Sequence, residues 1–169
     1  KNKFIDITDF KKLKKIIESY KPDFIFHLAA QALVKQSYSS PYHTWSSNLI
    51  GTLNILEVLR NYKGRTNVII ITSDKVYKNV EQEAGYKEED NLAGIDPYSA
   101  SKSAADISIN SYFLSYLKNK RNIAIAIARA GNVIGGGDWS DDRLLPDCIK
   151  SWSKNKIAKI RNPNSTRPW

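Results

Sequence analysis

Apolar residues recur along this chain in two patterns: short uninterrupted runs, and longer stretches in which every third or fourth position is apolar. The runs predict β-strands, and the periodic stretches predict amphipathic helices. We expect strands at 3–7, 23–28, 67–71, 122–128 and 156–160, and we expect the strand at 23–28 to be buried. We expect one helix between a cap at Thr8 and a stop at Pro22, and further helices at 40–62, 98–116 and 143–154, which leaves 29–40 as a loop.

Strands that alternate with helix-length segments favour parallel pairing, because a crossover through a helix returns the chain in the same direction. The sequence therefore predicts an α/β fold built on a parallel sheet. Residues 74–97 interrupt the alternation with a polar stretch that has no clear period, and a stretch of this kind usually carries function in a compact domain. A second irregular stretch, the glycine-rich segment 129–142, follows a later strand.

Candidate chemistry gathers where the strand at 67–71 ends and where the helix at 98–116 begins. The strand is followed by Thr72-Ser73-Asp74-Lys75, which brings hydroxyl and ionisable groups to the edge at which open α/β sheets bind ligands. Tyr98 and Lys102 are four residues apart and share one helix face. Since a nearby cation favours the ionised form of a phenol, Tyr98 is a candidate acid–base catalyst.

The net charge of +9 comes largely from lysine-rich stretches at 11–15 and 118–121, on or just after expected helices. A solvated helix face is the simplest interpretation, and a basic rim for an anionic, phosphate-bearing substrate is the alternative. No basic stripe with interleaved aromatic residues is present, so we expect no nucleic-acid partner.

A single cysteine, Cys148, allows no internal disulfide and indicates a reducing, cytoplasmic location. No apolar stretch reaches the length of a membrane span and no signal peptide is visible, so we expect no membrane partner. We also expect no metal site. Neither end resembles a natural terminus, and we expect the chain to be a piece of a longer protein.

Several motifs carry a resemblance to known families. Ser73 after one strand, followed by Tyr98-x-x-x-Lys102 on the next helix, resembles the extended short-chain dehydrogenase/reductase superfamily, whose members are Rossmann-fold enzymes acting on nucleotide sugars. Within it, the segments 72–75, 129–139 and 161–169 look like the CDP-glucose 4,6-dehydratase family, in the same order and nearly end to end. Ala32, Lys35, Val76 and Lys78 depart from that family's usual residues.

The resemblance implies an incomplete Rossmann-like, doubly wound parallel sheet. Residues 1–130 would form a partial NAD-binding domain, and 131–169 would begin a sugar-nucleotide-binding region. The glycine-rich phosphate loop of the first strand is missing, and Gly135-Gly136-Gly137 cannot replace it because these residues follow a late strand with the wrong spacing. We therefore expect this polypeptide alone to bind NAD poorly. The residues implied in NAD contact are Asp6, Ile7, Leu28, Ala29, Ala30, Gln31, Asn48, Thr72, Tyr98 and Lys102.

The implied reaction removes water across carbons 5 and 6 of CDP-glucose after oxidation at carbon 4, with return of the hydride to carbon 6. Tyr98 would take the proton of the carbon-4 hydroxyl, Lys102 would favour the phenolate, and Ser73 would donate a hydrogen bond to the same sugar oxygen. Asp74 would protonate the departing carbon-6 hydroxyl. Lys75 would act either as the carbon-5 base or as a residue that positions water.

The resemblance also implies how the substrate and a second subunit are bound. Asn132 would contact the sugar nucleotide, and Arg167, assisted by Arg161, would neutralise its diphosphate. A homodimer would form through the helices at 41–62 and 98–117, and the pathway would be deoxysugar biosynthesis for O-antigen or lipopolysaccharide. The alternatives are a nucleotide-sugar 4-epimerase, another 4,6-dehydratase, or a catalytically incomplete binding or structural fragment.

Overall fold

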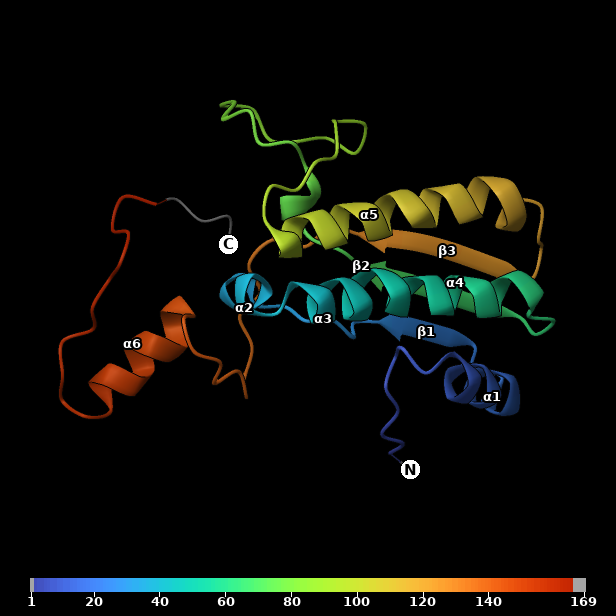
Figure 1. The fold of residues 1–169 in the computed structure, drawn as a ribbon, viewed down its shortest axis with the longest axis horizontal. Coiled ribbons are helices and arrows are strands. Elements are labelled where there is room, and N and C mark those ends of the chain that lie inside the picture. Colours follow the sequence, from blue (N-terminus) through green and yellow to red (C-terminus); the bar gives the residue numbers. More distant parts are fainter. Residues whose placement is uncertain (1, 166–169) are drawn as a thin grey trace. The chain divides into compact units, whose positions relative to one another are not determined.

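The computed structural model describes residues 2–165, so the predicted substrate residue Arg167 lies outside the described part of the chain. The chain divides into two compact units, with the boundary after Ala130. Figure 1 shows the secondary structure of both. Among the described residues of the second unit, the regular element is helix α6 (Leu144–Trp152).

The first unit is built on a parallel three-stranded sheet with the order β1-β2-β3. Its strands are β1 (Phe24–His27), β2 (Thr66–Ile71) and β3 (Ile123–Ala128). The central strand aligns Val68 with Ile25 on one side and with Ile125 on the other. The expected α/β class and the parallel pairing are confirmed.

Helices line one face of this sheet (Figure 1). Helix α3 (Pro41–Trp45), the π-helical turn η1 (Ser46–Ile50) and α4 (Gly51–Asn61) follow one another without a break and together form the helix expected at 40–62. Helix α5 (Pro97–Tyr112) lies beside α4 and continues into a second π-helical turn, η3 (Phe113–Leu117). The core between helices and sheet is aliphatic, with fully or almost fully buried Leu56, Leu59, Val68, Ile70 and Ile109.

The amino-terminal segment differs from the expectation in two ways. Residues 3–7 form no strand; the carbonyl oxygens of Ile7 and Thr8 instead accept hydrogen bonds from the side-chain amide of Asn54. Helix α1 (Phe10–Tyr20) is capped by Asp9 rather than by Thr8, because the Asp9 carboxylate accepts from the backbone N–H of Lys12.

Three further predictions about local structure are wrong. The expected loop at 29–40 contains helix α2 (Val34–Ser39). Residues 156–160 form no strand, since no other strand lies among the described residues of the second unit to pair with them. Strand β1 is not buried as expected: Phe24 and Phe26 are exposed, because the described helices cover the opposite face of the sheet.

The polar segment 74–97 has more structure than its sequence suggests. It opens with a 3-10 turn, η2 (Asp74–Val76), and Tyr77 then forms an antiparallel bridge with Leu92. Val76 is completely buried, and its carbonyl oxygen accepts from the N–H of Ala93 at 2.9 Å. The segment is therefore a folded-back hairpin-like loop at the carboxyl end of β2.

Candidate active site

Helix α5 is fastened to the carboxyl end of β2 at two points that flank the predicted catalytic residues. Lys102 donates from Nζ to the carbonyl oxygen of Ile71 at 3.0 Å. Ser103 donates from Oγ to the carbonyl oxygen of Val76 at 2.9 Å. Ser73 and Asp74 lie between these anchor points, so the strand end and the helix start meet as the sequence predicted.

Lys102 is the most deeply placed cationic group of this site. It is 7% exposed, and burial lowers its pKa from the usual 10.5 to about 8. A buried ammonium group acts on its neighbours through a lower dielectric than a surface lysine does, so its field on a nearby phenol is stronger. Tyr98 lies four residues earlier on the same helix face and is half-buried.

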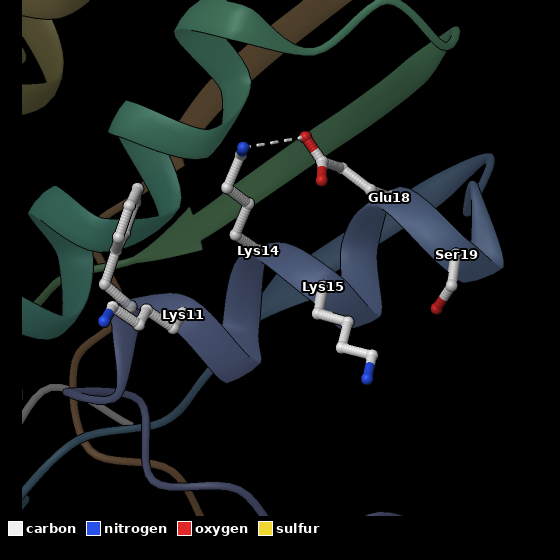
Figure 2. A pocket seen from close by; sticks show the side chains of 6 residues that line it. Lys11, Lys14, Lys15, Glu18 and Ser19 are labelled. Carbon is white, nitrogen blue, oxygen red and sulfur yellow. Dashed lines mark ion pairs between the residues drawn. The ribbon is translucent and has the colours of Figure 1, made fainter.

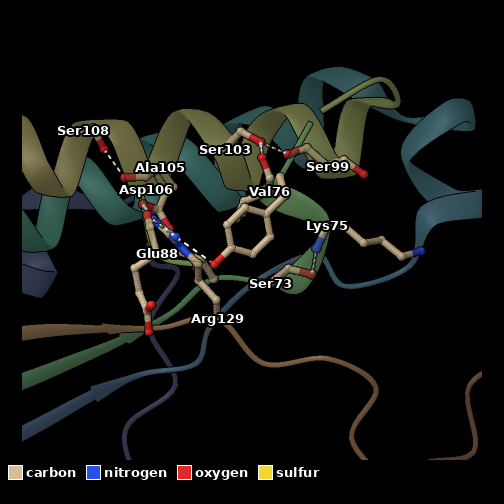
Figure 3. A network of polar contacts seen from close by, with 12 residues as sticks. Ser73, Lys75, Val76, Glu88, Ser99, Ser103, Ala105, Asp106, Ser108 and Arg129 are labelled. Atoms are coloured by element: carbon tan, nitrogen blue, oxygen red, sulfur yellow. Dashed lines mark hydrogen bonds and ion pairs between the residues drawn. The ribbon is translucent and has the colours of Figure 1, made fainter. Parts of the chain in front are cut away.

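Ser73 and Asp74 form a small hydrogen-bonded turn. The Ser73 hydroxyl donates to Asp74 Oδ1 at 3.1 Å and accepts from the backbone N–H of Lys75 at 3.2 Å. Figure 3 shows this turn, with the Lys75 side chain extending away from it. Ser73 is buried, Asp74 is half-buried and Lys75 is exposed, so the two ionisable side chains are open to a ligand.

Two predicted cofactor residues, Gln31 and Asn48, bind each other. The backbone N–H of Gln31 donates to Asn48 Oδ1 at 2.9 Å, and Asn48 Nδ2 donates to the carbonyl of Gln31 at 3.1 Å and to Ser101 Oγ at 2.9 Å. Asn48 is 1% exposed. Because its amide hydrogens are both used inside the protein, Asn48 serves to hold the loop after β1 against α5.

The other residues predicted to contact NAD differ in how accessible they are. Leu28 and Ala29 at the carboxyl end of β1 are exposed, Ala30 is half-buried, and Ile7 packs against Gly51. Thr72 is buried and donates to Asp106, whereas the exposed Asp6 caps a turn by accepting from Thr8. Leu28 and Ala29 are thus the most accessible of these residues at the carboxyl edge of the sheet, where open α/β folds bind their ligands.

His27, the last residue of β1, is a buried residue that the sequence did not place among the candidate site residues. Its Nε2 lies 3.1 Å from Thr52 Oγ1, and that hydroxyl donates to the carbonyl of Asn48 at 2.7 Å, so Nε2 carries the imidazole hydrogen. Burial, and secondarily the charge of Lys102, lower the pKa of His27 to about 4. The imidazole is therefore neutral at physiological pH.

The substrate residues predicted in the second unit have different surroundings. Asn132 is exposed. Arg161 is paired with Asp142 and lies 3.6 Å from a carboxylate oxygen of Asp147. A diphosphate that binds Arg161 has to compete with these two carboxylates.

A surface hollow of about 620 Å³ lies along α1, and no candidate catalytic residue is among those that line it. Figure 2 shows the lining side chains. It is lined by Phe10, Lys11, Lys14, Lys15, Glu18 and Ser19. Lys14 forms an exposed ion pair with Glu18 at 3.5 Å. These features favour a solvated helix face over a binding site for the lysines of this region.

No helix among residues 2–165 combines the length and the apolar character that crossing a membrane requires.

Known proteins that resemble this chain in sequence or in fold include nucleotide-sugar dehydratases and epimerases. The chain is 45% identical over 168 residues to a CDP-glucose 4,6-dehydratase of Salmonella typhimurium, a match that covers 97% of this chain and 47% of the relative. A UDP-glucose 4-epimerase of Thermus thermophilus solved with NAD superposes with a TM-score of 0.71 at 28% identity, over 82% of this chain and 43% of that one. A dTDP-glucose 4,6-dehydratase of Bacillus anthracis, also solved with NAD, has the same fold, with a TM-score of 0.73 at 24% identity over 91% and 44% of the two chains.

The chain thus spans about half the length of the relatives it matches. The resemblance seen in the sequence is confirmed by the Salmonella relative and by the folds of the solved structures. A family model described as GDP-mannose 4,6 dehydratase matches residues 3–150, which is most of the chain. The chain belongs to this family of Rossmann-like nucleotide-sugar enzymes.

Proposed function

We propose that this chain carries the catalytic residues of an NAD-dependent 4,6-dehydratase that converts CDP-glucose to CDP-4-keto-6-deoxyglucose. The observation that carries the proposal is the bond from Lys102 Nζ to the carbonyl of Ile71. It brings the Tyr98–Lys102 face of α5 against the strand end that bears Ser73 and Asp74. The similarity to a CDP-glucose 4,6-dehydratase supports the choice of nucleotide and sugar.

Tyr98 is the proposed base for the carbon-4 hydroxyl. Lys102 favours the phenolate through its charge, and Ser73 donates a hydrogen bond to the sugar oxygen as charge develops on it. In the structure the Ser73 hydroxyl donates to Asp74, so a bound sugar oxygen has to take over that hydrogen. NAD, when bound, would supply the hydride acceptor for carbon 4 and the hydride donor for carbon 6, and carbon 5 regains a proton as the hydride returns.

The elimination is assigned to the two residues after Ser73. Once carbon 4 is a ketone, the proton on carbon 5 is acidic, and its loss together with the carbon-6 hydroxyl gives water. Asp74 is the proposed acid for that hydroxyl. Lys75 is exposed and is proposed either to take the carbon-5 proton or to position water.

The rest of the assignment concerns binding and assembly. Asn132, Arg161 and Arg167 are proposed to bind the nucleotide and its diphosphate. Exposed apolar side chains on the two long helices support a homodimer through this surface, among them Tyr42, Ile50, Ile107, Phe113 and Leu114. A cytoplasmic location and a role in deoxysugar biosynthesis for O-antigen or lipopolysaccharide are part of the same proposal.

The test is a competition assay on the complete gene product. CDP-glucose, dTDP-glucose and GDP-mannose are supplied in equal amounts with NAD, and the products are identified by mass spectrometry. Loss of water from the CDP sugar is the expected result. Turnover of dTDP-glucose alone would overturn the CDP assignment, inversion without loss of water would identify a 4-epimerase, and absence of any turnover would favour a binding or structural module.

A further inference from the structure

A buried ion pair links three segments of the first unit next to the proposed site (Figure 3). Arg129, one residue beyond β3, donates from Nε and Nη2 to the two carboxylate oxygens of Asp106 on α5, each at 2.9 Å. Asp106 is fully buried and the Arg129 side chain is 13% exposed. The hydroxyl of Thr72, immediately before Ser73, donates to the same carboxylate at 3.1 Å.

The remaining donor of Arg129 reaches into segment 74–97. Nη1 donates to the hydroxyl of Tyr77 and to the carbonyl oxygen of Glu88, both at 2.9 Å. The guanidinium carbon also lies 5.0 Å from the centre of the Tyr77 ring, which stacks on Tyr86 at 5.0 Å. One arginine therefore holds both limbs of the folded-back loop.

This loop begins with Asp74 and Lys75, the residues assigned to the elimination. Tyr77 follows Lys75 by two positions, and the N–H of Asp74 donates to the carbonyl of Ala130, the residue after Arg129, at 3.0 Å. The contacts that converge on Arg129 and its neighbour thus add to the bonds from Lys102 and Ser103 in setting the place of Asp74 and Lys75 relative to α5.

We propose that Arg129 is a positioning residue for the elimination step, because it ties the loop that carries Asp74 and Lys75 to Asp106 on the helix that carries Tyr98 and Lys102. The inference rests on the dehydratase function proposed above. Buried ion pairs are weak contributors to net stability, since the free energy of removing both charges from water opposes their attraction. Because Nη1 of Arg129 bonds to the loop while its other two nitrogens bond to Asp106, we assign this pair the role of positioning the loop.

Two variants of the complete gene product test the proposal. Arg129→Met/Asp106→Asn removes both charges, leaves an acceptor for Thr72, and avoids an unpaired buried charge. Tyr77→Phe removes only the hydroxyl that Arg129 binds and keeps the ring stack. The matched control is Lys14→Met/Glu18→Gln, which removes the exposed ion pair on α1 by similar substitutions.

Oxidation at carbon 4 and elimination are distinguished by two kinetic readouts. With CDP-glucose, we expect the double variant to lose about tenfold or more in kcat with KM changed by less than about threefold. We also expect the absorbance of reduced nicotinamide to accumulate during turnover, because carbon 4 is still oxidised while the elimination lags. Tyr77→Phe should shift both readouts in the same direction by less, and the control should match the wild type.

Hydrogen exchange of the ligand-free protein gives a readout that does not depend on activity. Amides in 74–93 should exchange faster in both test variants, and those of α5 should keep wild-type rates. Unchanged kcat, or a loss of kcat without accumulated reduced nicotinamide, would overturn the proposal. If the double variant does not fold, Tyr77→Phe decides by the same criteria; if the wild type shows no turnover, the dehydratase function fails and the exchange comparison alone decides whether Arg129 holds the loop.

Discussion

Lys102 on α5 and Ile71 at the end of β2 are joined by a hydrogen bond of 3.0 Å from the ammonium to the backbone carbonyl. The bond fixes where a helix with Tyr98 in its first turn stands relative to a strand end that is followed closely by Ser73. A lysine that served only to snorkel would direct its ammonium to solvent, whereas this one is buried against the sheet edge. The contact is the basis for treating Tyr98, Lys102 and Ser73 as one site.

Tyr98→Phe should abolish most of the turnover of the complete gene product while leaving its fold intact. Removal of a general acid–base group lowers rates by roughly 10²–10⁴-fold, and phenylalanine keeps the ring and its packing. Tyr20→Phe, at an exposed position on α1, is the matched control. The measurements are kcat with CDP-glucose and a far-ultraviolet circular dichroism spectrum; wild-type kcat in Tyr98→Phe would remove Tyr98 from catalysis.

Acid should destabilise the first unit through His27. The pKa of His27 is about 4 in the folded protein because of burial and the nearby charge of Lys102, and the usual value of 6.5 applies when unfolded. Between these values the unfolded chain binds more protons, so stability falls as the pH is lowered from 6.5 towards 4. A shift of this size corresponds to about 3 kcal/mol in the free energy of unfolding.

The measurement for His27 is urea unfolding at a series of pH values, compared between the wild type and His27→Gln. The loss of stability across this pH window should be clearly smaller in the variant, since glutamine does not titrate. Parallel curves for the two proteins would show that His27 does not set the acid sensitivity.

The strand end and helix start of the site could be predicted from the sequence because their signals are local. An apolar run ending in Thr72-Ser73-Asp74-Lys75 and a helical Tyr-x-x-x-Lys each lie within a few residues, and parallel strands bring their carboxyl ends to one edge. The roles of Asn48 and Arg129 depend instead on partners that are distant in sequence. Asn48 binds Gln31 and Ser101, and such pairings leave no periodic pattern.

The strand errors have a related cause. Residues 3–7 and 156–160 have β-forming composition, but a strand exists only where a neighbour offers free backbone groups, and composition does not report the neighbour. The short helix α2 was missed because Val34–Ser39 is too brief to show a helical period.

Asn48→Ala should lower the stability of the first unit by about 1–3 kcal/mol, because it leaves buried polar groups of Gln31 without partners. Asn110→Ala is the control, since Asn110 is exposed on α5 and its side chain holds no comparable network. Thermal and urea unfolding of both variants provide the measurement. Equal stabilities would mean that the loop after β1 keeps its place without Asn48.

Gly94→Ala should disturb the start of α5, where Tyr98 lies, although Gly94 takes no part in the proposed reaction. A Cβ on Gly94 would lie 2.0 Å from the backbone nitrogen of Ala100, a distance at which the first turn of α5 has to move. Gly85→Ala is a close control, because Gly85 belongs to the same segment 74–97 and a Cβ there has no atom within 4 Å. We expect Gly94→Ala to lose about 1–3 kcal/mol in the free energy of unfolding.

Turnover should fall as well, since the helix that positions Tyr98 is displaced, whereas Gly85→Ala should match the wild type in both measurements. Wild-type stability and kcat in Gly94→Ala would contradict the close approach of this loop to α5 and, with it, the placement of the loop beside the catalytic helix.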